Sequence, residues 1–207
     1  MMKNLFLLGG ALALAGCINL GGQRNTPAVV NYVLNDTAPG DAGPLRAKVP
    51  HGGMEPVPTL LVPDTTAASF YDTDKLVFSR SADTRGHYQF ARWTERPGKR
   101  FADLMRARLG QQRAWRVSAA GGYVSGDALL DTELVEFYHD AASNPGQIRL
   151  MLRAELIDLK KRSLLGRQVF GQTVPLTSYD AAGAAMASNL AVSRALDDLG
   201  VWLATFR

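Results

Sequence analysis

The sequence predicts an α+β fold, in which a largely antiparallel sheet of about eight strands carries two main helices packed on one face. Three observations predict it. Residues 148–156 alternate apolar and polar side chains, as in a half-buried antiparallel strand. Other short runs rich in β-branched and aromatic residues are separated by turn residues, and two distant segments repeat apolar residues at helical steps of three and four.

The first half of the domain should contain four short strands, at residues 29–35, 59–62, 75–79 and 87–93. The first two are separated by residues 36–57, a polar segment rich in proline and glycine. Loops of that length in compact domains are commonly functional or disordered. We therefore consider residues 36–57 both as a candidate contact site for a partner and as a spacer without a role.

Two helices are predicted from their apolar stripes. The first spans about residues 97–112, because Pro97 fits a first helical turn and Phe101, Leu104, Met105 and Leu109 follow at helical spacing. The second begins near Asp180 and carries a stripe of Val192, Leu196, Leu199, Leu203 and Phe206.

Between the helices, strands are expected at residues 114–118, 128–138, 148–156 and 164–174. The last two should pair as a long hairpin across the polar turn Lys160–Ser163. The glycine-rich segment 121–126 separates the first two and is interpreted as a turn.

The N-terminus has the anatomy of a signal peptide. Lys3 gives a positive start, and residues 5–16 are uncharged but too short to span a bilayer, which takes about 20 apolar residues. Leu14, Ala15, Gly16 and Cys17 follow in an order that resembles the bacterial lipobox. That resemblance implies cleavage before Cys17 and acylation of its sulfur, which would hold the chain on membrane lipid through acyl chains. The alternative is an incidental cysteine in an ordinary signal sequence.

These features divide the chain into a signal peptide at 1–16, a lipidated N-terminus and tether at 17–28, and a single periplasmic domain at 29–207. Gly21, Gly22 and Pro27 fit a flexible tether.

The residues that commonly carry catalysis or bind metals show no recognisable arrangement. A single cysteine excludes an intramolecular disulfide, and His51, His87 and His139 lack metal-ligand spacing. Ser125 lies in Gly-x-x-Ser-Gly rather than the nucleophile elbow of hydrolases. The acidic pairs Asp72/Asp74, Asp131/Glu133 and Asp197/Asp198 are best explained as solvated side chains. We therefore predict no catalytic residue, no metal and no cofactor.

The formal net charge of +4 is mild, with a local cluster at Lys99, Arg100, Arg106, Arg108 and Arg113. A solvated helix face explains this cluster better than nucleic acid, and an exported lipoprotein meets little nucleic acid. Anionic lipid or an acidic partner is the better electrostatic match. Arg100, Arg106 and Arg108 are accordingly candidate partner-binding residues.

The order of several segments resembles the ABC-type transport auxiliary lipoproteins. These are the lipobox, residues 59–81, residues 88–109, the long hairpin and the final helix ending at 195–203. Within them Tyr88, Trp93, Glu95 and Pro97 match the family pattern. Residues 71–74 depart from the turn common in the family, a departure that concerns local geometry rather than the fold.

The resemblance implies a non-enzymatic lipoprotein at the periplasmic face of the outer membrane, serving an Mce-type system that moves phospholipid or other hydrophobic molecules. It also implies an Mce-domain partner and ring-like self-association. Ile18 fits outer-membrane sorting, because aspartate at that place commonly marks inner-membrane retention. A structural or assembly lipoprotein of another envelope complex is the main alternative, and a lipid-anchored hydrolase has the least support.

Overall fold

The computed structural model describes residues 27–37, 57–112 and 114–206. Within them, nine strands form one sheet and two long helices pack against it. The strands are β1 (Val30–Tyr32), β2 (Thr59–Val62), β3 (Thr66–Ala67), β4 (Lys75–Ser79), β5 (Gly86–Trp93), β6 (Arg116–Ala119), β7 (Ala128–Asp140), β8 (Gln147–Asp158) and β9 (Ser163–Pro175). The helices are α1 (Pro97–Gln111) and α2 (Ala181–Leu203), followed by a 3-10 turn at Ala204–Phe206.

Strand β7 organises the sheet. Along one edge it pairs antiparallel with β8, which in turn pairs antiparallel with β9. Along the other edge it pairs in parallel with β2, β3 and β4, one after another. Strand β6 then adds to β2, β5 to β4, and β1 to β5.

The prediction of a largely antiparallel sheet of about eight strands is therefore only partly confirmed. Among the described strands, five of the eight pairings are parallel, although two of the antiparallel ones are the longest. The pattern of side chains in a strand reports which face is buried, not the direction of its neighbour. The extra strand, β3, has only two residues and is too short to show a pattern.

The long hairpin confirms the alternation seen in the sequence. Every second residue of β8 is buried, namely Ile148, Leu150, Leu152, Ala154 and Leu156. The residues between them, such as Arg149 and Arg153, lie on the opposite face of the sheet. The predicted hairpin between residues 148–156 and 164–174 is also confirmed.

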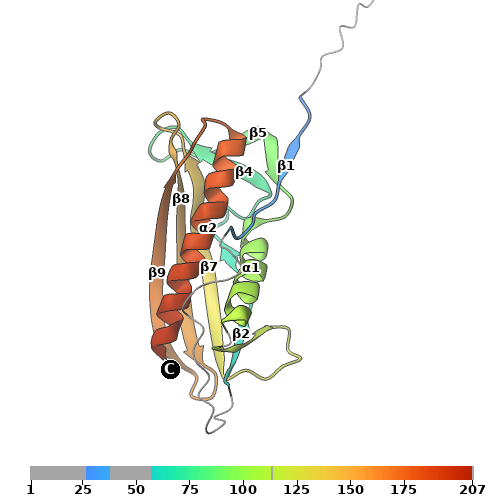
Figure 1. Ribbon diagram of the computed structural model, residues 1–207, viewed down its shortest axis with the longest axis vertical. Coiled ribbons are helices and arrows are strands. Elements are labelled where there is room, and N and C mark those ends of the chain that lie inside the picture. Colours follow the sequence, from blue (N-terminus) through green and yellow to red (C-terminus); the bar gives the residue numbers. More distant parts are fainter. Residues whose placement is uncertain (1–26, 38–56, 113, 207) are drawn as a thin grey trace, which may run out of the picture.

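Both helices lie in front of the sheet in Figure 1, so their predicted packing on one face is confirmed. Pro97 occupies the start of α1, and Gly98 passes so close to β3 that a Cβ there would lie 2.6 Å from the Thr65 carbonyl oxygen. Asp180 caps α2 by accepting a hydrogen bond from the Gly183 amide at 2.7 Å. The predicted stripe of α2 is buried from Val192 to Leu203.

Candidate functional site

The chain after β1 lies between the two helices as a short strap, which we define as residues Leu34–Thr37. The Leu34 side chain is buried, and its carbonyl accepts a hydrogen bond from Arg100 Nε at 2.9 Å. The Asn35 amide donates to Asn189 Oδ1 at 3.0 Å, and the Thr37 amide donates to Ser193 Oγ at 2.7 Å. The strap therefore ties the start of the domain to both α1 and α2.

Arg108 is the centre of this arrangement. Only 4% of its side chain is exposed, and it lies between Asp36 of the strap and Asp197 of α2. Its Nε donates to Asp36 Oδ2 at 2.8 Å, while Ser193 Oγ donates to Asp36 Oδ1 at 2.7 Å. Burial lowers the pKa of Arg108, but the bonds and charges of the two carboxylates outweigh burial and raise the pKa above its ordinary value.

The other basic residues of α1 also contact the chain itself. Arg106 bonds to Asp64 and Asp103, and Arg100 bonds to Asn35 as well as to the Leu34 carbonyl. Lys99 is exposed, and Arg113 lies outside the described residues. The predicted basic face is thus partly a set of internal contacts, and partner binding by Arg100, Arg106 and Arg108 stays a prediction.

A signal for the buried ion pair was present in the sequence. Arg108 lies seven residues after Phe101 and three after Met105, which places it on the apolar stripe of α1. An arginine on a buried stripe needs a carboxylate partner. The sequence could not show which one, because Asp36 is 72 residues away in the chain and Asp197 is 89.

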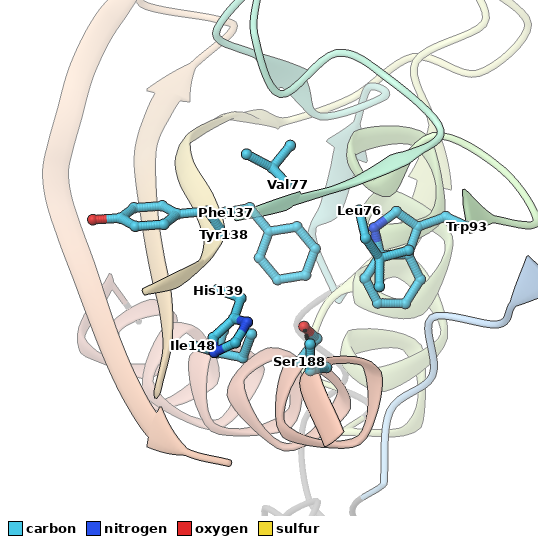
Figure 2. Close-up of a pocket in the computed structure, with 9 residues that line it drawn as sticks. Leu76, Val77, Trp93, Phe137, Tyr138, His139, Ile148 and Ser188 are labelled. Atoms are coloured by element: carbon cyan, nitrogen blue, oxygen red, sulfur yellow. Dashed lines mark hydrogen bonds between the residues drawn. The ribbon is translucent and has the colours of Figure 1, made fainter. Parts of the chain in front are cut away.

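A pocket opens between β4, β7, β8 and α2 (Figure 2). Its wall is mainly apolar, with Leu76, Trp93, Phe137 and Ile148 among the lining residues. It encloses about 220 Å³ with its open mouth included. That is below the roughly 300–1,000 Å³ of most small-molecule sites, so this pocket does not hold a lipid with two acyl chains.

Ser188 and His139 both line this pocket, but they do not form a nucleophile and its base. The Ser188 hydroxyl donates to the Ala184 carbonyl at 2.8 Å. Both ring nitrogens of His139 have other partners, Tyr88 at Nδ1 (2.7 Å) and the Pro145 carbonyl at Nε2 (3.0 Å). No dashed line joins the two side chains in Figure 2. The pair therefore lacks the hydrogen bond that activates a serine.

The partners of His139 define its protonation state. Burial raises the pKa of Tyr88 to about 12, so the phenol keeps its proton and donates it to Nδ1. Nε2 must then carry the ring proton, because a carbonyl can only accept. Burial lowers the pKa of His139, partly offset by the Pro145 carbonyl and Asp140. His139 is therefore a buried, neutral imidazole that joins β7 to β5 and to the following turn.

Acid should destabilise the domain through His139. An unfolded histidine has a pKa of about 6.5, and the folded pKa is lower, so below about pH 6.5 the unfolded state binds more protons. Above about pH 6.5 His139 is neutral in both states and causes no loss of stability. As the pH drops from there toward the folded pKa, we expect the free energy of unfolding to decrease. Urea unfolding at several pH values between 5 and 8 measures the slope.

His139→Gln should flatten this dependence, while His87→Gln is the matched comparison. Burial also lowers the pKa of His87, which adds a contribution of the same sign. The His87→Gln chain should keep the slope that belongs to His139. Equal slopes in the parent and in His139→Gln would contradict the assignment.

Five of the six acidic residues considered as pairs in the sequence contact other side chains of the chain, and Asp131 is exposed. Asp72 pairs with Arg96, Asp74 with Arg92, and Glu133 with Arg153. Asp198 accepts a hydrogen bond from Gln172. Across residues 27–37, 57–112 and 114–206, no group of three histidine, cysteine or acidic residues could hold a metal ion.

The predicted lipidation motif lies outside the described residues. This applies to Leu14, Ala15, Gly16 and Cys17, to residues 38–56 of the predicted loop, and to the proposed signal peptide and most of the tether. Lipidation at Cys17 and the division of the chain at residues 16 and 28 stay predictions. No helix among the described residues is both long enough and apolar enough to span a bilayer.

Comparison with known proteins places the chain in a family. The family model of the ABC-type transport auxiliary lipoprotein component matches residues 40–200. The chain belongs to this family. The resemblance noted in the sequence is thereby confirmed, and the match extends from the segment after the strap to the last turns of α2.

Two solved structures share the auxiliary lipoprotein's fold. A DUF330 protein from Xanthomonas campestris has a TM-score of 0.70 at 19% identity, covering 84% of this chain and 94% of its own. An uncharacterised protein has a TM-score of 0.62 at 12% identity, covering 72% of this chain and 94% of its own. At such identities the likeness concerns the fold alone. No curated protein matches the chain.

Proposed function

We propose that this auxiliary lipoprotein is a non-catalytic docking component, held on the outer membrane by acyl chains at Cys17. It would serve an ABC-type system that moves phospholipid or another hydrophobic compound between membranes, and its partner would be the Mce-domain protein of that system. Membership of the transport auxiliary family over residues 40–200 is the observation that carries this proposal.

Two further observations support docking over handling of cargo. The pocket in Figure 2 is smaller than a site for a two-chain lipid. The serine and histidine that line it are each hydrogen-bonded elsewhere, so they supply no activated nucleophile. A docking component acts through its surface and loops, so it does not require a cargo site in this pocket.

Outer-membrane sorting and ring assembly belong to the proposal as well. The absence of aspartate at residue 18 supports sorting to the outer membrane. Ring-like self-association follows only from the family resemblance. Sedimentation of the detergent-solubilised protein measures the number of copies directly.

The segment after the strap is the first region in which to test partner contact. Asp36 and Thr37 hold the strap in place, so the test has to leave them intact. Residues 40–55 can be replaced by the same number of glycine and serine residues, which preserves the reach between Thr37 and Val57. We expect the melting temperature of this chain to lie within a few degrees of the parent's. The amount of Mce-domain protein that co-purifies should fall at least about tenfold, which corresponds to about 1.4 kcal/mol of binding free energy.

The control replaces the exposed residues 120–125 with glycine and serine. If the 40–55 replacement folds and keeps its partner, the segment is a spacer, and α1 with Arg100, Arg106 and Arg108 becomes the next surface to test. If the parent itself never retains an Mce-domain protein, the alternative of a structural lipoprotein in another envelope complex gains the support.

A further inference from the structure

The turn between β8 and β9 forms a projecting tip, which we define as residues Leu159–Leu165. Asp158 Oδ1 accepts hydrogen bonds from the backbone amides of Lys160 and Lys161, at 2.9 and 2.8 Å. The Leu159 amide donates to the Asp127 carbonyl at 3.0 Å. These bonds hold the turn in one shape and direct its side chains outward.

The hairpin tip combines cationic and apolar side chains in direct succession. Lys160 and Lys161 are 78% and 79% exposed, and Arg162 is exposed beside them. Leu164 and Leu165, which follow, are 50% and 42% exposed. Two adjacent leucines left this open are costly in water unless another surface covers them.

The positive charge of the tip is only partly offset by the chain. Lys160 pairs with Asp127 at 2.6 Å and Lys161 with Asp158 at 4.0 Å. Arg116 also lies close enough to Asp127 to affect its titration. Among the described residues, four cations (Lys160, Lys161, Arg162 and Arg116) therefore lie near two carboxylates (Asp127 and Asp158) at this end. Because both lysine pairs are exposed and weak, the lysines can turn to an external anion at little cost.

The tip rests on a rigid base at the end of α2. The backbone of Gly166 lies against the C-terminal turn, so that a Cβ there would be 2.5 Å from Phe206 Cζ. Trp202 and Phe206 pack edge to face with their centroids 5.0 Å apart. These contacts fix the strand that follows the tip against the end of α2.

The tip and the start of β1, to which the predicted tether leads, lie toward opposite ends of the sheet. Phe78 of β4 pairs with Gly86, the first residue of β5, and with His139 near the C-terminal end of β7. The start of β5 therefore lies at the His139 end of the sheet. Strand β1 runs parallel to β5, so the chain enters β1 from the His139 end. Ala128, at the other end of β7, pairs with Asp158 beside the tip. Eleven strand residues separate the two ends, roughly 36 Å. In Figure 1, β1 lies near the upper end of the sheet and the end of α2 at the lower.

We propose that the hairpin tip is a peripheral binding surface for an anionic bilayer, and that this bilayer is not the one that holds Cys17. Exposed lysines beside leucines are typical of segments that bind the headgroup region, where the cations meet phosphates and the leucines enter the acyl boundary. Lysine and leucine are instead uncommon among the residues that dominate protein interfaces. The choice of a second bilayer rests on the lipid anchor of the proposed function, because the domain then extends away from its own membrane.

The first test uses the chain from residue 17 with Cys17→Ser, so that no acyl chain contributes. It is floated with vesicles of phosphatidylglycerol and phosphatidylcholine, or of phosphatidylcholine alone. We expect binding only to the anionic vesicles, weakened by salt, and a loss of at least about tenfold in Lys160→Glu/Lys161→Glu. Leu165→Ser should weaken binding without changing its salt dependence. The matched control, Lys75→Glu/Arg194→Glu, makes the same charge change at exposed sites away from the tip and from the basic cluster of α1.

Equal flotation of the parent with neutral and anionic vesicles would overturn the proposal, and so would full binding by the folded lysine variant. The second test holds the lipidated protein in phosphatidylcholine vesicles and adds dye-labelled anionic vesicles. Co-sedimentation of the dye supports contact with a second bilayer. If the tip binds anionic vesicles in the first test but the dye-labelled vesicles do not co-sediment in the second, the tip contacts the anchoring membrane. That result would overturn the claim of a second bilayer. If the lipidated protein does not stay in the phosphatidylcholine vesicles, the lipid anchor of the proposed function is refuted. The flotation test is independent of that outcome, because it uses a chain without acyl groups.

Discussion

Arg108→Ala should lower the free energy of unfolding by about 3–5 kcal/mol, the range for removing one partner of a buried ion pair. The substitution leaves Asp36 mostly buried without its cation, whereas Asp197 is exposed enough to be solvated by water. It also loosens the strap, because the two hydrogen bonds from Arg108 to the Asp36 carboxylate are lost. Urea unfolding followed by circular dichroism measures the change.

Arg106→Ala is the matched control on the same helix. Its partners Asp64 and Asp103 are largely exposed, so we expect a loss of about 1 kcal/mol or less. Arg108→Met combined with Asp36→Asn should recover part of the loss, because removing both charges leaves neither unpaired. An Arg108→Ala chain that unfolds at the parent's urea concentration would show that the strap contributes little to stability.

Cys17→Ser should abolish acylation, and a high-salt wash, which removes the weaker contact of the hairpin tip, should then release the protein from the membrane. Serine cannot form the thioether that holds the diacylglyceryl group, and without acyl chains the membrane affinity worth about 0.8 kcal/mol per buried methylene is lost. Membrane fractionation with a radiolabelled fatty acid measures both anchoring and acylation. A Cys17→Ser chain that stays membrane-bound and labelled would refute the lipoprotein prediction.

Ile18→Asp provides the comparison for sorting. This variant keeps Cys17 and should remain acylated, but we expect it at the inner membrane while the parent lies at the outer membrane. Density-gradient separation of the two membranes decides this. The same position for both chains would remove residue 18 as a support for outer-membrane sorting.

The sequence predicted those parts of the fold that depend on neighbouring residues. The period of two in residues 148–156 reported a buried face of β8, and the stripe from Val192 to Leu203 reported the buried face of α2. Pro97 marked the start of α1 correctly. The family followed from the order of several such segments, because order along the chain is also a property of the sequence alone.

Contacts between residues that are distant in the chain were decided only by the tertiary structure. The topology of the fold, which packs the strap against both helices, brings Asp36, Arg108 and Asp197 together, although nothing local in the sequence specifies that meeting. The same topology places the hairpin tip and the start of β1 at opposite ends of the sheet. Hydrophobic periodicity predicts that a residue is buried, but the partner of that residue depends on how whole elements pack. The sequence therefore showed Arg108 as a charged residue on an apolar stripe, but it could not identify the carboxylates that pair with Arg108.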